Sequence, residues 1–338
     1  MKNLNIVFTQ PNIAELVEKE LSTELEAGNV LVRLERSTIS SGTERANLIG
    51  DPYISIATTK PNHKFPRQCG YSSSGIIEAV GEGVDNVKPG DRVAITGSVH
   101  AKRLVMHKTQ VYKLADNISM EAAALSYISN FPMAAIRKCL LEMGESAIVM
   151  GQGVLGQLAV KLLRIAGAMP IIAADPDPAK RQRALELGAD VAVDPTAPDF
   201  VEKVHAVTGN GANVAIEVTG VDKALDNALD ALAPFGRVTL LGCTRHSNFA
   251  IDYYHKVHGK GITIIGAHTL ARPRQESHHG WWTGKDDTEA FLKMLEFGRL
   301  NLDGFVDEVH SPKEATEVFG RLANGGPFPV VQFDWTQI

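Results

Sequence analysis

The chain has 338 residues, of which 44% are hydrophobic and 22% charged, and its formal net charge is −5. This balance is typical of a globular protein, and the length favours two domains over one core. The negative charge and the lack of a basic block argue against nucleic acid as a partner. No apolar run approaches the roughly 20 residues of a membrane span, so we expect no membrane partner.

The N-terminal segment "MKNLNIVFTQPN" predicts a strand and lacks the apolar core and cleavage site of a secretory leader. The three cysteines, Cys69, Cys139 and Cys243, lie far apart and form no CxxC pair. This pattern argues against a disulfide framework and against a zinc site built from cysteine. We therefore expect a cytoplasmic protein.

Residues 1–118 have the pattern of a β-rich module. Strands are predicted in "NVLVRLERSTI", "SGIIEAVGEGV" and "VKPGDRVAI", separated by Gly and Pro turns. From Ser119, a candidate N-cap, an Ala- and Leu-rich segment predicts a helix that breaks around Pro132.

From Ser146 onward, apolar strand patterns alternate with helix patterns. The six strands are "SAIVMG", "MPIIAAD", "DVAVD", "NVAIEVTG", "GRVTLLG" and "GITIIGAH". Near-continuous apolar runs indicate that helices cover both faces of a parallel sheet, which predicts an α/β, doubly wound fold. After about residue 272 follow a polar loop, two helix patterns and a strand, "FPVVQFDW", that could return to the first module. We therefore expect one domain of residues 1–118 and 273–338 and a second of residues 119–272.

The stretch "IVMGQGVLGQLAVKLL" places Gly151, Gly153 and Gly156 in GxGxxG spacing between a strand and a helix. The first glycine allows a tight turn, the second lets a pyrophosphate approach the backbone, and the third lets helix and strand pack closely. The helix start at Val154 and Leu155 offers free N–H groups to the anion. A dinucleotide cofactor is predicted, and the alternative is a glycine turn that only packs.

Asp175 ends the next predicted strand, where a carboxylate can accept both adenosine-ribose hydroxyls and repel a 2′-phosphate. NAD is therefore favoured over NADP, with Lys180 expected to cover the ribose. Arg181 and Arg183 lie close in sequence and oppose this charge argument. In the alternative interpretation, Asp175 is only a helix cap.

Together, "GYSSSGIIEAVGEGVDNVKPGDRV" (70–93), "MGQGVLGQLAVKLLRIAGA" (150–168) and "ALELGAD" (184–190) resemble the medium-chain dehydrogenase/reductase superfamily. The resemblance covers essentially the whole chain. It implies a GroES-like catalytic domain, a Rossmann domain and an active-site cleft between them. It also implies that Thr219, Gly242 and Cys243 lie along the cofactor.

The residues at the superfamily's zinc positions differ from its zinc alcohol dehydrogenases. The metal cysteine corresponds to Ser41, before Gly42-Thr43-Glu44, the metal histidine to Tyr71, and the third ligand position falls near Tyr127. Zinc needs about three Cys, His or carboxylate ligands, so no catalytic metal is expected. The motifs are similar to a zinc-free branch with bacteriochlorophyllide hydroxyethyl dehydrogenase and sugar-associated two-domain oxidoreductases.

Without a metal, hydrogen-bond donors must stabilise the charge on the reacting oxygen. Our hypothesis is that Tyr71 or Tyr127 binds that oxygen, that Ser41 and Thr43 assist, and that Glu44 orients the site. A phenol acting as a base would need a cationic neighbour, for which Lys102 and His268 are candidates. The alternative is that both tyrosines only pack.

The aromatic loop adds three candidate substrate contacts, His268, Trp281 and Trp282, although the tryptophans could equally anchor the loop. The histidines of "HKVH" (255–258) and "HHGWW" (278–282) are interpreted as solvated or capping groups. Cys243 is expected to pack rather than react.

We therefore predict a zinc-independent, NAD-dependent oxidoreductase that acts on a secondary alcohol or ketone, such as a sugar or cyclitol. The alternatives are an NAD(P)H-dependent quinone or enone reductase and a non-catalytic NAD-binding protein. A homodimer is expected, because residues 261–268 would form an apolar outer strand of the sheet.

Overall fold

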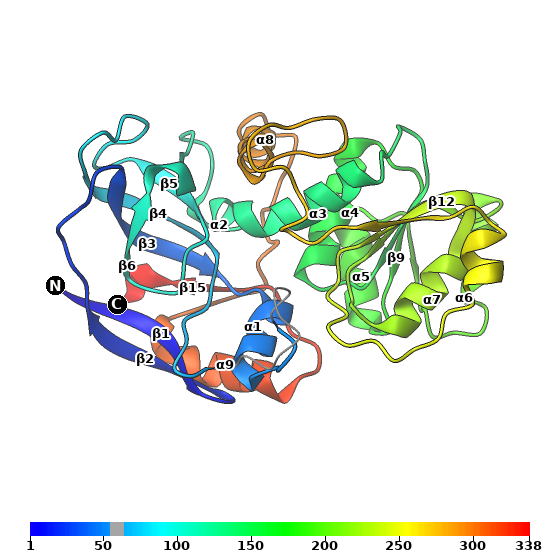
Figure 1. The fold of residues 1–338 in the computed structure, drawn as a ribbon, viewed down its shortest axis with the longest axis horizontal. Helices are drawn as coiled ribbons and strands as arrows, with labels where there is room; N and C mark the ends of the chain where they lie inside the picture. Colours follow the sequence, from blue (N-terminus) through cyan, green and yellow to red (C-terminus); the bar gives the residue numbers. More distant parts are fainter. Residues whose placement is uncertain (55–63) are drawn as a thin grey trace. The chain divides into compact units, whose positions relative to one another are not determined.

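The computed structural model describes residues 1–54 and 64–338. The chain divides into two compact units, one of Met1–Ile128 with Glu289–Ile338 and the other of Ser129–Thr288 (Figure 1). Both boundaries fall later in the chain than the expected positions at 118/119 and 272/273.

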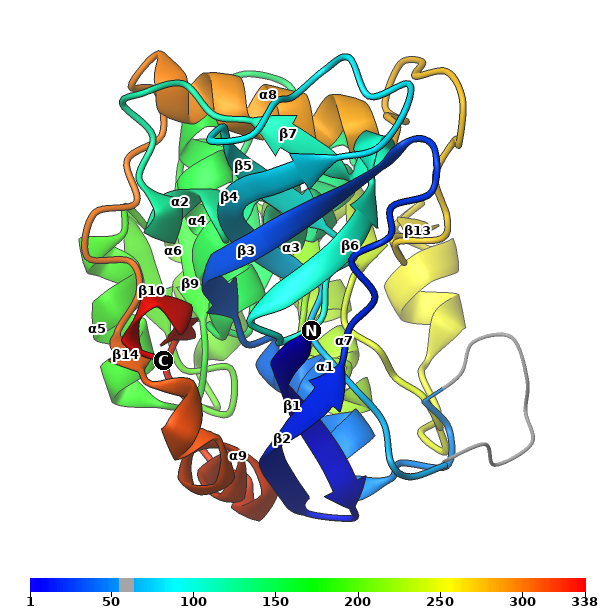
Figure 2. The same ribbon diagram turned by 90° about the vertical axis from the view of Figure 1, so that its left-hand side faces the viewer.

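The first unit contains an antiparallel hairpin and a larger, mainly antiparallel sheet, in which only the β14–β15 pair is parallel among the described residues (Figure 2). A hairpin joins β1 (Lys2–Gln10) to β2 (Ile13–Glu20). The larger sheet has the order β14-β15-β3-β4-β5-β7, and β6 also pairs with β3. Its strands are β3 (Asn29–Thr38), β4 (Ser72–Val80), β5 (Arg92–Thr96), β6 (Arg103–His107), β7 (Val111–Lys113), β14 (Glu308–His310) and β15 (Val331–Asp334).

The end of the chain completes the sheet of the first unit. β15 pairs antiparallel with β3, so the predicted return of "FPVVQFDW" to the N-terminal module is confirmed. Helix α9 (Ala315–Asn324) contributes Val318 and Phe319 to the same core, where Trp335 is also fully buried. These residues, 280 or more positions after β3, explain why the C-terminus belongs to the first unit.

Two local predictions for the first 138 residues were wrong. Helix α1 (Ser41–Ile49) lies where we expected only strands and turns, and it ends at Gly50 in the left-handed conformation that glycine favours. The helix after Ser119 breaks between α2 (Met120–Ala123) and α3 (Ser126–Lys138), while α3 continues through Pro132.

The break lies there because side chains from the sheet bind the exposed peptide groups. The hydroxyls of Thr38 and Ser72 both donate to the Ala124 carbonyl oxygen, each at 2.7 Å. Ser72 Oγ also accepts the Ile128 N–H at 3.3 Å. Buried peptide groups need such partners, so the hydroxyls stabilise the gap between the two helices.

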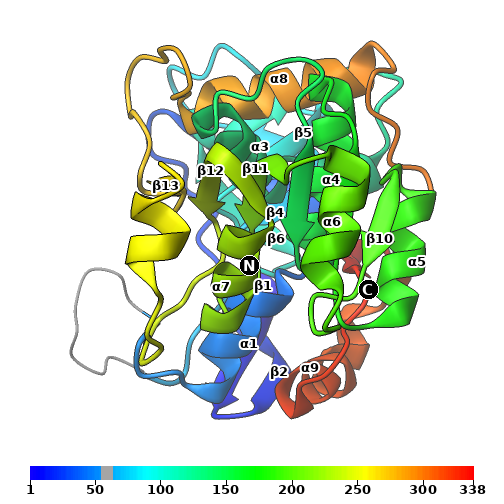
Figure 3. The ribbon, with the colours of Figure 1, turned by 90° about the vertical axis from the view of Figure 1, so that its right-hand side faces the viewer.

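The second unit is built on a six-stranded parallel sheet with the order β10-β9-β8-β11-β12-β13 (Figure 3). The strands are β8 (Ala147–Met150), β9 (Ile171–Ala174), β10 (Val191–Val193), β11 (Ala212–Glu217), β12 (Leu232–Leu240) and β13 (Thr263–Gly266). Counted from β8, this is the 3-2-1-4-5-6 order of a doubly wound dinucleotide-binding fold. The predicted fold class is confirmed.

Helices connect and cover these strands. They are α4 (Val154–Ala166), α5 (Pro178–Glu186), α6 (Phe200–Thr208) and α7 (Asp222–Ala231), and α8 (Gly284–Glu296) follows the sheet. Phe200 and Val204 of α6 and Leu229 of α7 share one apolar core with Ile148 and Ile172. Within residues 1–54 and 64–338, no helix is both long and apolar enough to cross a bilayer.

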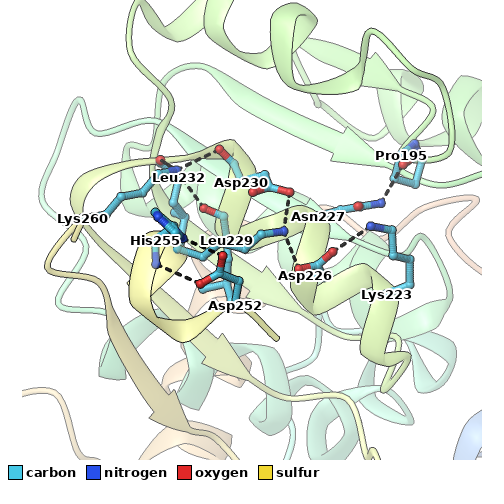
Figure 4. A network of polar contacts seen from close by, with 11 residues as sticks. Pro195, Lys223, Asp226, Asn227, Leu229, Asp230, Leu232, Asp252, His255 and Lys260 are labelled. Atoms are coloured by element: carbon cyan, nitrogen blue, oxygen red, sulfur yellow. Dashed lines mark hydrogen bonds and ion pairs between the residues drawn. The ribbon is translucent and has the colours of Figure 1, made fainter. Parts of the chain in front are cut away.

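A polar network fixes the segment between β12 and β13 to helix α7 (Figure 4). Lys256 pairs with Asp226 and with Asp230, and Lys260 Nζ donates to the carbonyl oxygens of Leu229, Asp230 and Leu232, each at 3.0 Å. The ammonium of Lys260 therefore satisfies the last turn of α7, where carbonyl groups lack helical partners and a positive charge is favourable.

A second ionic cluster suggests a pH-dependent contribution to stability. His310 Nε2 lies 2.8 Å from Glu308 and Nδ1 lies 2.6 Å from Glu314. Burial alone would lower the pKa of His310, but the hydrogen bonds to both carboxylates outweigh it and raise the pKa above 6.5. A raised folded-state pKa gives stability that is fully present below the unfolded value and is lost as pH rises through the folded value.

We predict that the melting temperature of the wild type falls more steeply between about pH 6 and pH 8 than that of His310→Gln. Thermal unfolding followed by circular dichroism at several pH values measures the difference. His279→Gln, at an exposed histidine, is the matched control. Parallel curves for wild type and His310→Gln would contradict the prediction.

Candidate functional site

The glycine turn between β8 and α4 has the geometry that the motif predicts. Gly151 has φ +100°, and a Cβ at Gly156 would lie 1.9 Å from the Gly151 carbonyl oxygen. Only glycine therefore fits at positions 151 and 156. A Cβ at Gly153 would meet nothing within 4 Å, so space remains beside the start of α4 at Val154 and Leu155.

Asp175 follows β9 and faces this turn. Its side chain is 5% exposed, and its two oxygens accept the N–H groups of Gln152 at 2.8 Å and Asp177 at 2.9 Å. Arg181 donates to the backbone carbonyl of Asp175 and lies 3.5 Å from Asp194. Arg183 lies 3.4 Å from Glu186. Each of the two arginines thus has an acidic side chain beside it.

The next two strands end beside the same glycines. A Cβ at Gly151 would lie 2.6 Å from Thr219 Cγ2, and one at Gly220 would lie 2.7 Å from the Cys243 backbone. Gly242 is equally constrained, because its Cβ would lie 2.7 Å from a carboxylate oxygen of Glu217. The predicted residues Thr219, Gly242 and Cys243 therefore gather at the carboxyl ends of β11 and β12, where doubly wound folds bind ligands.

Glu217 is a residue of this cluster that the sequence analysis missed. It is 2% exposed, and it accepts hydrogen bonds from the Thr219 hydroxyl and from the N–H groups of Thr219 and Gly220. Burial raises its pKa, although these donors act in the opposite direction. A carboxylate at the end of the otherwise apolar strand "NVAIE" is the feature of the sequence that could have identified Glu217.

In the first unit, hydroxyl groups gather at the start of α1. The Tyr71 hydroxyl donates to Ser40 Oγ, and the Tyr71 and Tyr127 rings meet edge to face with centroids 5.4 Å apart. Loss of hydration raises the pKa of Tyr71, hydrogen bonds to Ser40 and Thr43 lower it, and the charge of Glu44 raises it, with a net increase. The Tyr71 phenol therefore stays protonated at neutral pH.

The serine that meets Tyr71 is Ser40 and not the predicted Ser41. Ser40 is the N-cap of α1, yet its hydroxyl makes no capping hydrogen bond. Among the described residues, no hydrogen bond of the Ser41 side chain is found, although Ser41 begins the same helix. The two serines are adjacent in the sequence, and the position at which α1 begins decides that Ser40, and not Ser41, faces Tyr71.

Glu44 lies one turn into α1 and is buried against His100. Both side chains are 1% exposed, and Glu44 Oε2 lies 2.9 Å from His100 Nε2. Glu44 Oε1 accepts the Ser40 N–H at 2.8 Å. His100 also lies 2.8 Å from the Ser37 hydroxyl, which accepts the Trp335 Nε1–H. His100 was missed, since an isolated histidine in "GSVHAKR" gives no signal in the sequence.

Three of the predicted residues surround the C-terminal end of α3. Trp281 lies under Lys138 Nζ at 4.6 Å from the ring centroid, and Trp282 lies under the Arg137 guanidinium at 3.6 Å. Burial and the charge of Arg272 lower the pKa of Lys138 to about 8. Burial, followed by the charge of Lys138, also lowers the pKa of His268. Both indoles therefore have a cation–π partner within their own unit.

Two predicted cationic residues have different surroundings. Lys102 donates to the carbonyl oxygens of Trp335 and Ile338, so its ammonium binds the end of the chain. Lys180 is half-exposed on α5, five residues after Asp175. The roles expected for Lys102 as a partner of a phenol and for Lys180 at the ribose stay predictions.

The residues at the superfamily's three metal positions do not fit a zinc ion. Ser41, Tyr71 and Tyr127 offer only neutral oxygen atoms, whereas catalytic zinc takes nitrogen, thiolate or carboxylate ligands. Across residues 1–54 and 64–338, no group of three or more His, Cys, Asp or Glu side chains could hold a metal ion.

Comparisons with known proteins agree with this architecture. Residues 26–124 match the alcohol dehydrogenase GroES-like domain, and residues 154–279 match the zinc-binding dehydrogenase family. (R,R)-butanediol dehydrogenase of Bacillus subtilis is 31% identical over 247 residues, which cover 64% of this chain and 70% of the relative. D-guloside 3-dehydrogenase of Escherichia coli is 26% identical, over 95% of this chain and 96% of the relative.

A solved structure shows the same fold. The 2R,3R-butanediol dehydrogenase of Bacillus subtilis superposes with a TM-score of 0.81 at 24% identity, over 98% of this chain and 99% of that chain. The chain belongs to the medium-chain dehydrogenase/reductase superfamily. It is an alcohol-type oxidoreductase.

Proposed function

We propose that this protein is an NAD-dependent dehydrogenase that interconverts a secondary alcohol and its ketone without a catalytic metal. The observation that carries the proposal is the cluster of Ser40, Thr43 and Tyr71 hydroxyls at the start of α1. Hydroxyl donors occupy the region where zinc-dependent relatives are expected to hold their metal. They offer hydrogen bonds in place of a Lewis acid.

Tyr71 is suited to act as the acid in ketone reduction. A phenol that remains protonated can donate a hydrogen bond, and then its proton, to a carbonyl oxygen. The start of α1 adds free N–H groups and a positive potential, which favour negative charge on the reacting oxygen. Tyr127, in contact with the Tyr71 ring, is the second candidate for this role.

The glycine turn is the proposed cofactor site. When bound, a nicotinamide cofactor supplies the hydride acceptor or donor. The space at Gly153 and the start of α4 suit a pyrophosphate, and the Asp175 carboxylate suits ribose hydroxyls. The acidic neighbours of Arg181 and Arg183 weaken the case for a 2′-phosphate, so NAD is the preferred cofactor.

The proposed substrate is a polyhydroxy compound such as a sugar, glycoside or cyclitol. A hydroxyl-rich cluster offers several donors and acceptors to such a molecule. The relative named for a guloside substrate aligns over nearly the whole chain, which agrees with this class. His268, Trp281 and Trp282 remain candidate substrate contacts.

Tyr71→Phe should lower kcat about 100-fold in NADH-linked reduction of a panel of ketoses and cyclic polyhydroxy ketones, because it removes the acid but keeps the ring. Tyr127→Phe should show whether the second tyrosine shares this role. Tyr112→Phe, in β7 of the same unit, is the matched control. Stopped-flow or steady-state absorbance of NADH measures the rates.

Other results would contradict this assignment. Full activity in the Tyr71→Phe and Tyr127→Phe double variant removes both tyrosines from the mechanism. Loss of activity on chelation, with one metal ion per chain, removes the metal-free mechanism. NADPH-linked reduction of quinones in place of polyol oxidation would favour an enone reductase, and NAD binding without turnover would favour a binding protein.

Asp175→Ala should raise KM for NAD about 10- to 100-fold while changing KM for NADP much less. A hydrogen bond to a charged group contributes about 1.5–3 kcal/mol, and 1.4 kcal/mol is a factor of ten. Asp177→Ala removes an equal charge two residues away, at the N-cap of α5, and is the matched control. Equal effects of Asp175→Ala on the two cofactors would contradict the NAD assignment.

A homodimer through β13 is also proposed. β13 lies at one end of the sheet order and carries two half-buried isoleucines, Ile264 and Ile265. An apolar edge strand of this kind is usually covered. Sedimentation equilibrium at micromolar concentration should give twice the chain mass, and a stable monomer would contradict the proposal.

A further inference from the structure

The Glu44–His100 pair lies directly behind the hydroxyl cluster and contacts both halves of it. One half is the Ser40 peptide, and the other is the segment that carries Tyr71. The two halves lie some 30 residues apart in sequence, and the Tyr71–Ser40 hydrogen bond joins them.

Glu44 holds the Ser40 peptide on both sides. Its backbone N–H donates to the Ser40 carbonyl oxygen at 2.8 Å, and its carboxylate accepts the Ser40 N–H at 2.8 Å. In an ordinary capping box the Ser hydroxyl would bind the helix backbone in return. Here the Ser40 hydroxyl makes no such bond and instead accepts from Tyr71.

His100 holds the other half. Its backbone N–H donates to the Cys69 carbonyl oxygen at 2.9 Å. Gly70, with φ +109°, packs so closely that an added Cβ would lie 3.1 Å from the His100 ring. The Tyr71 carbonyl oxygen, in turn, accepts the Gly97 N–H at 2.8 Å. The imidazole is therefore wedged between Glu44 and the backbone that leads into Tyr71.

The hydrogen bonds around the imidazole run in one consistent direction. Trp335 Nε1–H donates to Ser37 Oγ, whose hydroxyl can donate to His100 Nδ1. His100 Nε2–H then donates to Glu44 Oε2, which can only accept as a carboxylate. A neutral imidazole and an ionised carboxyl satisfy every donor in this chain. The rings of Phe319 and Phe333 contact the imidazole edge to face.

We propose that Glu44 and His100 are positioning residues that keep the Ser40 and Tyr71 hydroxyls within hydrogen-bonding distance of each other. This inference rests on the proposed role of Tyr71. The charge of Glu44 also acts on two neighbouring groups. After burial, it raises the pKa of the Cys69 thiol, which the charge of Arg67 lowers, and it adds to the raised pKa of the Tyr71 phenol. The pair therefore sets both where the phenol lies and how readily it gives up its proton.

The test uses Glu44→Gln, which keeps the shape and the oxygen that accepts from Ser40 but removes the charge. The Gln amide offers an N–H group where the carboxylate accepted the His100 Nε2–H, so the imidazole and the Tyr71 segment beside it should shift. Near-ultraviolet circular dichroism at neutral pH isolates this tyrosine when each protein is compared with its own Tyr71→Phe derivative. The Tyr71 signal should change in Glu44→Gln, and kcat should fall more than KM changes.

His100 is tested with a pair of substitutions. His100→Gln keeps a donor near the position of Nε2 and should retain kcat within a few fold, whereas His100→Phe should lower kcat about 100-fold, the cost of an active-site misplacement of about 1 Å. Trp335→Phe removes a buried donor at the far end of the same chain. It should lower the melting temperature while kcat stays near the wild-type value.

A purely structural role predicts a different pattern. In that case the Tyr71 circular dichroism signal of Glu44→Gln equals that of the wild type, and activity in all the variants follows only the folded fraction, which would overturn the inference. Failure of the proposed function shows separately, as full activity of Tyr71→Phe. The Tyr71 circular dichroism signal of Glu44→Gln still decides the positioning role in that case, because it requires no turnover.

Discussion

The chemistry proposed for the first unit depends on one buried carboxylate. Glu44 is 1% exposed, and burying an ion without partners would cost several kcal/mol. The protein offsets this cost with the His100 imidazole and the Ser40 N–H. Loss of one hydrogen-bond partner of a buried polar group typically costs about 1–3 kcal/mol, and more when the group is charged. The carboxylate therefore constrains the start of α1, and with it the hydroxyl that meets Tyr71.

Hydroxyl side chains in this unit serve two separate purposes. Thr38, Ser72 and Ser74 donate to carbonyl oxygens of residues 120–124 and so hold α2 against the sheet. Ser40 and Thr43 instead bind a phenol. The sequence shows only a hydroxyl-rich composition around residues 37–43 and 72–74. The partners of these hydroxyls separate those that stabilise the fold from those that are available for chemistry.

The second unit depends on close approach between backbone segments. Gly156 against Gly151, and Gly242 against Glu217, leave no room for a side chain. The three strand ends at β8, β11 and β12 can therefore meet in one place. The open space at Gly153 is the exception, and it lies where the cofactor phosphate is proposed. Within the glycine motif, Gly151 and Gly156 therefore allow close packing, whereas Gly153 leaves space for a ligand.

The sequence by itself determined the elements that have a local cause. Alternation of apolar runs and helix patterns identified all six strands of the parallel sheet, and the spacing of Gly151, Gly153 and Gly156 located the turn. Asp175 was found because a carboxylate at the end of β9 has a fixed distance from that turn. These features follow from residue type and periodicity over a few turns of chain.

Only the tertiary structure decided the features that depend on distant partners. The helix breaks at Ala124 rather than at Pro132, because Thr38 and Ser72 bind that carbonyl oxygen from the sheet. The tyrosine meets Ser40 rather than Ser41, and His100 joins the site through contacts with residues 37, 44 and 69. No sequence spacing encodes such pairs, because the sheet brings them together only when the fold is complete.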